Sequence, residues 1–274
     1  MLTAASIALL GGPLQAVGTL SILIAHEMGH YLACRYYRVD ATLPFLIPSP
    51  WIPLGPGLWG PLSPFGTFGA VIRIRSRIPH RRALFDIGIA GPLAGFAVCL
   101  PVLVLGIQEA RWIPNDSALG GRLLGDPLLL QWAVSWIKGT APSDSTLVIG
   151  PLGEAAWFGL LVTALNLMPI GQLDGGHVTY ALLGARAGRV FEAAWWVCVV
   201  LIYFSPSWVV WSVLLRVLGR RHPPTRDDAA PVGRGRVAVG IVGLLVLVVC
   251  FLPDPFPGSW ALLRELLGWP APPS

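Results

Sequence analysis

The sequence predicts an all-α, multi-pass integral membrane protein with about six transmembrane segments and a small membrane-associated β element. Of its 274 residues, 54% are hydrophobic and only 12% are charged, whereas a typical soluble domain carries roughly 25% charged residues. The apolar residues gather in runs close to the length of about 20 residues that a bilayer span needs. Arginines stand at the ends of these runs. Together these observations indicate a chain that is folded within a membrane.

Four apolar runs predict membrane spans. They cover residues 14–34, 83–107, 146–168 and 237–252. A further region, residues 190–218, is apolar but is interrupted by a Ser-Pro pair. Because proline breaks or kinks helices, this region is either one kinked span or a pair of short helices.

The net charge of +5 comes almost entirely from 18 arginines against one lysine. Arginine clusters follow the first run, precede the second and flank the region 190–218 on both sides, whereas the loop 108–145 carries only Arg111, Arg122 and Lys138. If all the clusters face the cytoplasm, the positive-inside rule favours a pair of helices over 190–218. The partner that this pattern indicates is the lipid bilayer, and no nucleic acid is expected.

Two segments between the first and second runs are not expected to be helical. Residues 44–64 contain seven prolines and predict a loop at the membrane interface, with Trp51 and Trp59 as anchors. In GTFGAVIRIRSRI, residues 66–78, isoleucines and arginines alternate after Val71, which predicts a strand. Such a strand could offer its edge to an extended peptide.

The stretch LIAHEMGHYLACR, residues 23–35, places two histidines and a glutamate inside the first apolar run. His26 and His30 are four residues apart, so on a helix they share one face and can bind the same metal ion. With Glu27 as general base, they form the H-E-x-x-H pattern of zinc hydrolases. A chance match is expected in well under roughly one in a hundred chains of this composition. Ionisable residues within a membrane are costly and usually functional, which favours a metal site over a merely polar helix face.

A catalytic zinc typically takes three protein ligands, so the third must come from elsewhere. His80 and His222 lie in arginine-rich loops and are poor candidates. Asp174 and His177 both lie in NLMPIGQLDGGH, just after the third apolar run. On chemistry alone either side chain could reach the metal.

HEMGH followed far downstream by N-x-x-P-x-x-x-L-D-G-G resembles the site-2 protease family, which are M50-type intramembrane zinc metalloproteases. The residues that match the second motif are Asn166, Pro169, Leu173, Asp174, Gly175 and Gly176. The resemblance implies one zinc ion per chain, with His26, His30 and Asp174 as its ligands and Glu27 as the catalytic base. Iron or cobalt would suit the same donors.

The segment FGAVIRIRSRIPHRRALFDIGIAGPLAG, residues 68–95, is similar to the cyanobacterial and plastid branch of this family, without a PDZ-like insertion. Residues 1–252 are expected to form the metalloprotease domain, and residues 253–274 a tail rich in proline and tryptophan. That branch usually has a complete span before the H-E-x-x-H helix. The opening MLTAASIALLGG is here either a short span or the end of one that starts upstream.

Other polar residues have expected roles outside the predicted ligand set. Asn166 either orients substrate and stabilises the oxyanion, as its family position implies, or satisfies helix backbone. His177 is expected to hold the metal ligands in place without itself binding the metal. Asp86 and Glu154 are expected to be structural partners of arginines or of helix ends. The glycines of GPLAG, residues 91–95, lack the spacing of a phosphate loop, so they predict helix packing and no nucleotide site.

The resemblance implies an intramembrane zinc endopeptidase that cleaves in or near transmembrane helices, acting in regulated intramembrane proteolysis. Its substrate would be a single-span membrane protein, and its expected location is the bacterial cytoplasmic membrane. One alternative is a zinc-binding transporter that uses the same ligands. Another is a non-catalytic protein that only binds membrane helices. The intact H-E-x-x-H and L-D-G patterns argue against the second alternative, and a glutamate placed as a base argues against the first.

Overall fold

The computed structural model describes residues 2–49, 51–55, 58–61, 67–114, 124–217, 224–229 and 231–269, and it is mostly helical, as predicted. The helices are α1 (Leu2–Tyr36), α2 (Arg81–Glu109), α3 (Leu128–Lys138), α4 (Pro151–Leu167), α5 (Asp174–Leu183), α6 (Ala187–Leu201), α7 (Ser207–Val217), α8 (Arg234–Cys250) and α9 (Ser259–Leu267). The two-stranded antiparallel sheets pair β1 (Phe45–Pro48) with β4 (Thr67–Val71), β2 (Trp51–Gly55) with β3 (Leu58–Pro61), and β5 (Arg111–Pro114) with β6 (Ser145–Val148).

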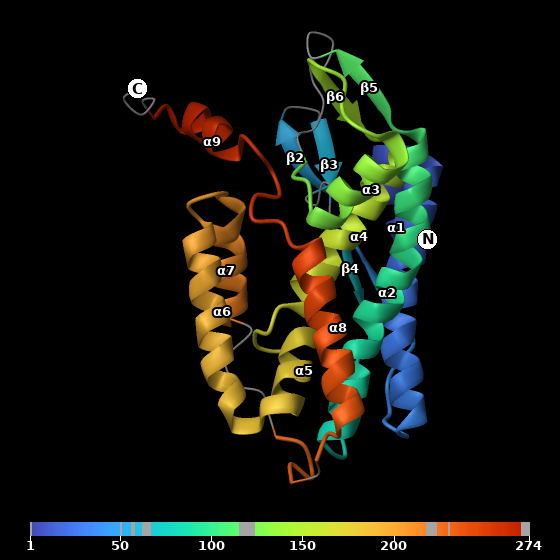
Figure 1. Ribbon diagram of the computed structural model, residues 1–274, viewed down its shortest axis with the longest axis vertical. Helices are drawn as coiled ribbons and strands as arrows, with labels where there is room; N and C mark the ends of the chain where they lie inside the picture. Colours follow the sequence, from blue (N-terminus) through green and yellow to red (C-terminus); the bar gives the residue numbers. More distant parts are fainter. Residues whose placement is uncertain are drawn as a thin grey trace.

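Helix α4 is the centre of the bundle, with α1, α2 and α8 packed around it (Figure 1). Its side chains are apolar on nearly all sides, and most of them are buried, as expected of a helix that other helices surround. Trp157 is fully buried, and its Nε1 donates a hydrogen bond of 2.6 Å to the carbonyl of Gly125. The indole therefore ties the central helix to the segment that leads into α3.

Helix α1 bends sharply near its start and then runs through the HEMGH motif. Gly12 has a φ of 85°, a value that glycine adopts without steric cost. Pro13 follows it and has no N–H to give to the preceding turn. The predicted run 14–34 is therefore helical throughout, and the helix that carries the motif begins after this break.

The other predicted spans are helical, but their limits and their number need correction. Helix α2 extends two residues beyond the predicted run at each end. The predicted run 146–168 begins as a helix only at Pro151, because the preceding residues form β6 and proline suits the first helical position. Among the described residues, α2 is the one helix long and apolar enough by itself to cross a membrane. Six spans are thus not confirmed.

The region 190–218 forms two helices, α6 and α7, which lie side by side and antiparallel (Figure 1). The chain turns through residues 202–206, and the N–H of Ser205 still bonds to the carbonyl of Leu201. Pro206 follows and cannot continue the helix, since it has no N–H to donate. Of the two interpretations left open by the sequence, the pair of helices is the one that the chain adopts.

The prediction of an irregular loop over residues 44–64 is wrong for its described part, which forms β1, β2 and β3. Proline removes one donor, so it is tolerated in strands that have a free edge. Each of these strands has a single partner in the part of the chain that the structure describes. The side chains of Trp51 and Trp59, predicted as anchors, lie outside the described residues.

The strand predicted over residues 66–78 is shorter than expected, because β4 ends at Val71. Beyond it the chain stays extended beside residues 40–42. The N–H of Arg75 bonds to the carbonyl of Asp40 at 2.8 Å, and Ile74 forms an isolated bridge with Ala41. The side chains of this segment still alternate in exposure, as the sequence pattern predicts. The arginines are exposed and the isoleucines are half-buried.

The arginine-rich segments gather at one end of the bundle. The end of α1 and the starts of α2, α6 and α8 all lie at the lower end in Figure 1, whereas β5 and β6 lie at the other. At the arginine-rich end, Nε of Arg81 donates to the carbonyl of Ala181 at 2.7 Å, and Nε of Arg82 donates to that of Pro231 at 2.6 Å. This separation of charge is the pattern expected of the positive-inside rule.

Candidate metal centre

Three predicted ligands converge from two helices. His26 and His30 lie on one face of α1, and Asp174 is the first residue of α5. Nε2 of His26 is 3.1 Å from Oδ2 of Asp174 and 3.1 Å from Nε2 of His30, and Nε2 of His30 is 3.2 Å from the same Oδ2. The two histidines are buried, at 4% and 6% exposure. In the part of the chain that the structure describes, this is the one group of three such residues whose donor atoms lie within 4.8 Å of one another.

The donor chemistry of this cluster fits a cation. Nδ1 of His30 is 2.6 Å from the carbonyl of Ile87, and a carbonyl can only accept, so Nδ1 carries the proton. Nε2 of His30 faces the Asp174 carboxylate and Nε2 of His26, so a cation placed between them would meet three donor atoms. In a tetrahedral zinc site, bonds of roughly 2.0–2.2 Å place neighbouring donors about 3.3 Å apart. The observed separations are close to that value.

Glycines of α2 make room for the histidines. A Cβ at Gly91 would lie 2.1 Å from Nε2 of His30, and one at Gly95 would lie 3.0 Å from Cβ of His26. The imidazole rings occupy the space that other side chains would fill. The predicted packing role of these glycines is confirmed, because their missing side chains let α1 bring His26 and His30 against α2.

The second motif brings Asp174 into reach through a tight turn between α4 and α5. Helix α4 ends at Leu167, two residues before Pro169, and the residue before a proline disfavours helical backbone. A Cβ at Gly175 would lie 2.0 Å from the carbonyl oxygen of Leu167, and one at Gly176 would lie 2.4 Å from that of Gly171. The Gly-Gly pair after Asp174 therefore permits the close approach that positions the aspartate.

Glu27 lies beside the ligands and is 7% exposed. Its carboxylate accepts a hydrogen bond from the backbone of Ile72, in the extended segment after β4. Sequence reasoning did not predict this contact, nor the contact between Ile87 and His30. Backbone groups have no residue signature, so only the packing of the helices could reveal them.

The remaining candidates have other positions. His177 lies one turn into α5, and its Cβ would be 3.0 Å from a Cβ placed on Gly88, outside the three-residue cluster. Asn166 is half-buried in the last turn of α4. His80 is the N-cap of α2, where its Nδ1 accepts a hydrogen bond from the N–H of Ala83. His222 lies outside the described residues.

The polar residues expected to be structural have partners of that kind. Asp86 pairs with Arg236 at 2.6 Å, and Glu154, in the first turn of α4, accepts a hydrogen bond of 2.9 Å from Gln15. The four cysteines, Cys34, Cys99, Cys198 and Cys250, are buried and free. They behave as small apolar side chains, as their scattered positions predict.

Comparison with known proteins gives a consistent result. The model of the family described as "Peptidase family M50" matches residues 15–205. The chain is 30% identical over 264 residues to a protein of Oryza sativa subsp. japonica named "Probable zinc metalloprotease EGY1, chloroplastic", covering 92% of this chain and 42% of that protein. It is 31% identical over 256 residues to the EGY2 protein of Oryza sativa subsp. indica, which is also named a probable chloroplastic zinc metalloprotease, covering 90% and 43%.

The chain thus spans less than half the length of these relatives. Their chloroplastic names give no support to the bacterial membrane expected from the sequence, whereas a membrane location fits the family. The matched region contains His26, Glu27, His30 and Asp174. From the extent of this match, together with the paired motifs, we conclude that the chain belongs to peptidase family M50.

Proposed function

We propose that this protein is a zinc-dependent intramembrane endopeptidase. The observation that carries the proposal is the convergence of His26, His30 and Asp174, with the carboxylate of Glu27 next to them in a buried position. Two imidazoles and one carboxylate make up the three protein ligands typical of a catalytic zinc site. A binding or transport protein would not require a fourth buried group placed as a base.

The residues have separate roles in peptide hydrolysis. A zinc ion held by the three ligands would polarise the scissile carbonyl and increase the acidity of the attacking water. Glu27 accepts a proton from that water and delivers it to the leaving amine. Its hydrogen bond from the Ile72 backbone orients the carboxylate for this transfer. Asn166, in the last turn of α4, is proposed to orient the substrate or to stabilise the oxyanion.

The extended segment after β4 is a candidate platform for the substrate. It lies against Glu27 through Ile72, and in the described residues β4 is paired only with β1. A helical substrate hides its carbonyls in its own hydrogen bonds, so it must be unwound before cleavage. Pairing along a free strand edge would hold the unwound segment next to the base. We therefore propose a single-span membrane protein as the substrate.

The site is proposed to lie toward the cytoplasmic side of the membrane. His30 is six residues before the end of α1, which at 1.5 Å per residue is about 9 Å from the arginine-rich end. We propose α1, α2, α4, α6, α7 and α8 as six membrane-crossing or membrane-embedded helices. A bacterial cytoplasmic membrane stays a prediction, because the relatives compared are chloroplastic.

The test is cleavage of model single-span substrates by the purified full chain and by Glu27→Gln. The variant keeps the size of the side chain but cannot accept the proton, so we expect cleavage to fall by about 10²–10⁴-fold with unchanged zinc content. Glu154→Gln is the matched control, since Glu154 lies at the start of α4 and its partner is Gln15. This control should cleave at the wild-type rate.

Other results would contradict the proposal in distinguishable ways. Full cleavage by Glu27→Gln would show that Glu27 is not the base. A wild-type protein that binds no metal would overturn the metal centre itself. Zinc flux into vesicles by both forms, without cleavage, would favour the transporter alternative.

A further inference from the structure

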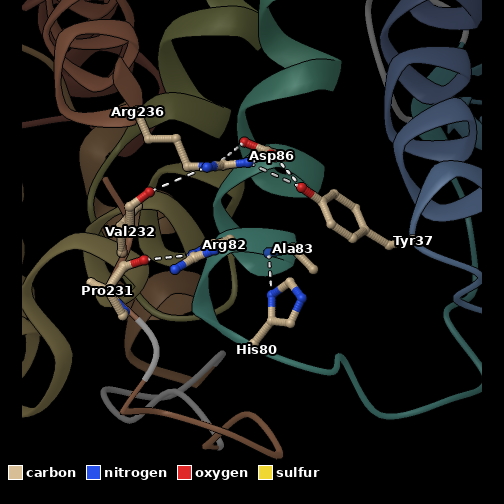
Figure 2. Close-up of polar contacts among 8 residues, drawn as sticks. All are labelled: Tyr37, His80, Arg82, Ala83, Asp86, Pro231, Val232 and Arg236. Carbon is tan, nitrogen blue, oxygen red and sulfur yellow. Dashed lines mark hydrogen bonds and ion pairs between the residues drawn. The ribbon is translucent and has the colours of Figure 1, made fainter. Parts of the chain in front are cut away.

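A polar cluster near the arginine-rich end joins three helices next to the metal centre. Figure 2 shows Asp86 of α2 between Arg236 of α8 and Tyr37, which follows α1. Nε and Nη2 of Arg236 donate to the two carboxylate oxygens of Asp86 at 2.8 and 2.6 Å. The hydroxyl of Tyr37 donates to Oδ2 of Asp86 at 2.5 Å and accepts from Nη2 of Arg236 at 3.1 Å. The carboxylate of Asp86 is thus held from two other parts of the chain, by Arg236 at both oxygens and by Tyr37 at one.

The cluster also holds the beginning of α2. The ring of Tyr37 packs edge-on against His80, with centroids 5.6 Å apart, and His80 is the N-cap of α2. Burial, followed by the neighbouring Asp86 carboxylate, raises the pKa of Tyr37. Its hydroxyl therefore stays protonated and continues to donate at neutral and moderately alkaline pH. Tyr37 consequently contacts the first turns of α2 at two points.

Asp86 is adjacent to the residue that orients a metal ligand. The carbonyl of Ile87 accepts the 2.6 Å hydrogen bond from Nδ1 of His30. This bond fixes the ring and leaves Nε2 free to bind a metal, and such outer partners of ligating histidines strongly affect metal affinity. Because Ile87 follows Asp86 in the same helical turn, any shift of Asp86 along or around α2 moves that carbonyl.

We propose that Tyr37, Asp86 and Arg236 form a positioning network that holds the Ile87 carbonyl on Nδ1 of His30 and so sets the imidazole for the metal. The network rests on the metal centre of the proposed function. It adds three residues that lie outside the group of candidate ligands. In this arrangement α8 contributes to the centre through Arg236, although none of the proposed ligands lies on α8.

The experiment is a Co²⁺ titration of the metal-free full chain in detergent, followed by visible absorption. We expect Arg236→Gln and Asp86→Asn to weaken Co²⁺ binding by about tenfold, the lower end of the range for outer partners of a ligand. Tyr37→Phe removes a single oxygen and should weaken binding a few-fold. The absorption spectrum of the bound cobalt should also change, because the orientation of His30 changes.

Arg82→Gln is the matched control for Arg236→Gln. Arg82 also joins α2 to the segment before α8, through its 2.6 Å bond to the Pro231 carbonyl, but its side chain is not hydrogen-bonded to Asp86 or Tyr37 (Figure 2). It should bind Co²⁺ within twofold of the wild type. Thermal unfolding of the metal-free forms shows whether the two arginine variants lose similar stability.

Equal weakening by Arg82→Gln and Arg236→Gln would overturn the proposal, since the effect would then be general loosening. Wild-type Co²⁺ affinity in both Asp86→Asn and Tyr37→Phe would also overturn it. If Arg236→Gln does not fold, Tyr37→Phe with Arg82→Gln still decides the question. Absence of Co²⁺ binding by the wild type would instead overturn the proposed metal centre and the network with it.

Discussion

The contact between α1 and α2 and the contact between α6 and α7 are built in opposite ways. In the first, a Cβ at Gly29 would lie only 2.4 Å from the carbonyl oxygen of Ala90, so the two backbones approach closely. In the second, a long side chain bridges the two helices, because Nε1 of Trp195 donates to the carbonyl of Ser212 at 2.9 Å. The first contact holds His26 and His30, two of the three candidate metal ligands, and the second holds none of the three.

This difference indicates that the two contacts have different roles. The α1–α2 contact positions the candidate ligands, whereas the α6–α7 pair presents apolar side chains to its surroundings. Close approach of α1 and α2 fixes the rings of His26 and His30 to within a narrow range of positions, because no flexible side chain intervenes. The pair α6 and α7 instead exposes a broad apolar surface, including Trp196, Val200 and Val210. Lipid tails can cover such a surface as well as protein can, so this pair tolerates looser packing.

The largest expected effect tests which residue of α5, Asp174 or His177, binds the metal together with the histidines of the α1–α2 contact. Asp174→Ala removes one of three ligands, so we expect Co²⁺ or zinc affinity to fall more than about a hundredfold, beyond the range for outer partners. His177→Ala should reduce it far less, because His177 lies outside the cluster. Metal content after dialysis against a chelator measures both. Equal losses would make His177 a ligand.

The second largest effect on metal affinity is expected from adding a single methyl group at Gly91. In Gly91→Ala the new Cβ would lie 2.1 Å from Nε2 of His30, so the ring must move away from the metal position. We expect metal affinity to fall by about tenfold or more, as when a ligand loses its orientation. The control is Gly188→Ala in α6, where nothing lies within 4 Å of the added atom.

The control should bind metal normally and gain roughly 0.5–1 kcal/mol of stability, since alanine favours a helix over glycine. Metal titration and thermal unfolding of the two variants test the comparison directly. Normal metal binding by Gly91→Ala would show that α1 and α2 can move apart without cost. That result would remove the distinction between the two contacts.

The smallest effect is expected in the pair of helices α6 and α7. Arg216 lies 3.7 Å from Glu192 and 4.5 Å above the ring of Trp195, and the ion-paired side chains are 38% and 37% exposed. Arg216→Ala should lower the free energy of unfolding by no more than about 1 kcal/mol, because exposed ion pairs contribute little. Unfolding in mixed micelles measures this change. A loss of metal affinity in the same variant would contradict the separation proposed here.

Much of the helical framework, and the residues of the candidate metal centre, could be predicted from local signals. Apolar runs predicted α1, α2, α4 and α8, and the Ser-Pro interruption with its flanking arginines favoured the pair α6 and α7. The strands in the proline-rich segment were missed, because proline content indicates loops unless the free edge of a two-stranded sheet is known in advance. The start of α4 was misplaced for a similar reason, since pairing with a distant strand overrode local hydropathy.

The sequence by itself determined which atoms could bind a metal. The i, i+4 spacing of His26 and His30 places both rings on one helix face whatever surrounds them, and the second motif marked Asp174. Only the tertiary structure decided that Asp174, rather than His177, meets them, because both lie within four residues of each other. It also brought the carbonyl of Ile87 to Nδ1 of His30, and Arg236 to the carboxylate of Asp86. Such contacts depend on the distance and register between helices, which local residue patterns do not encode.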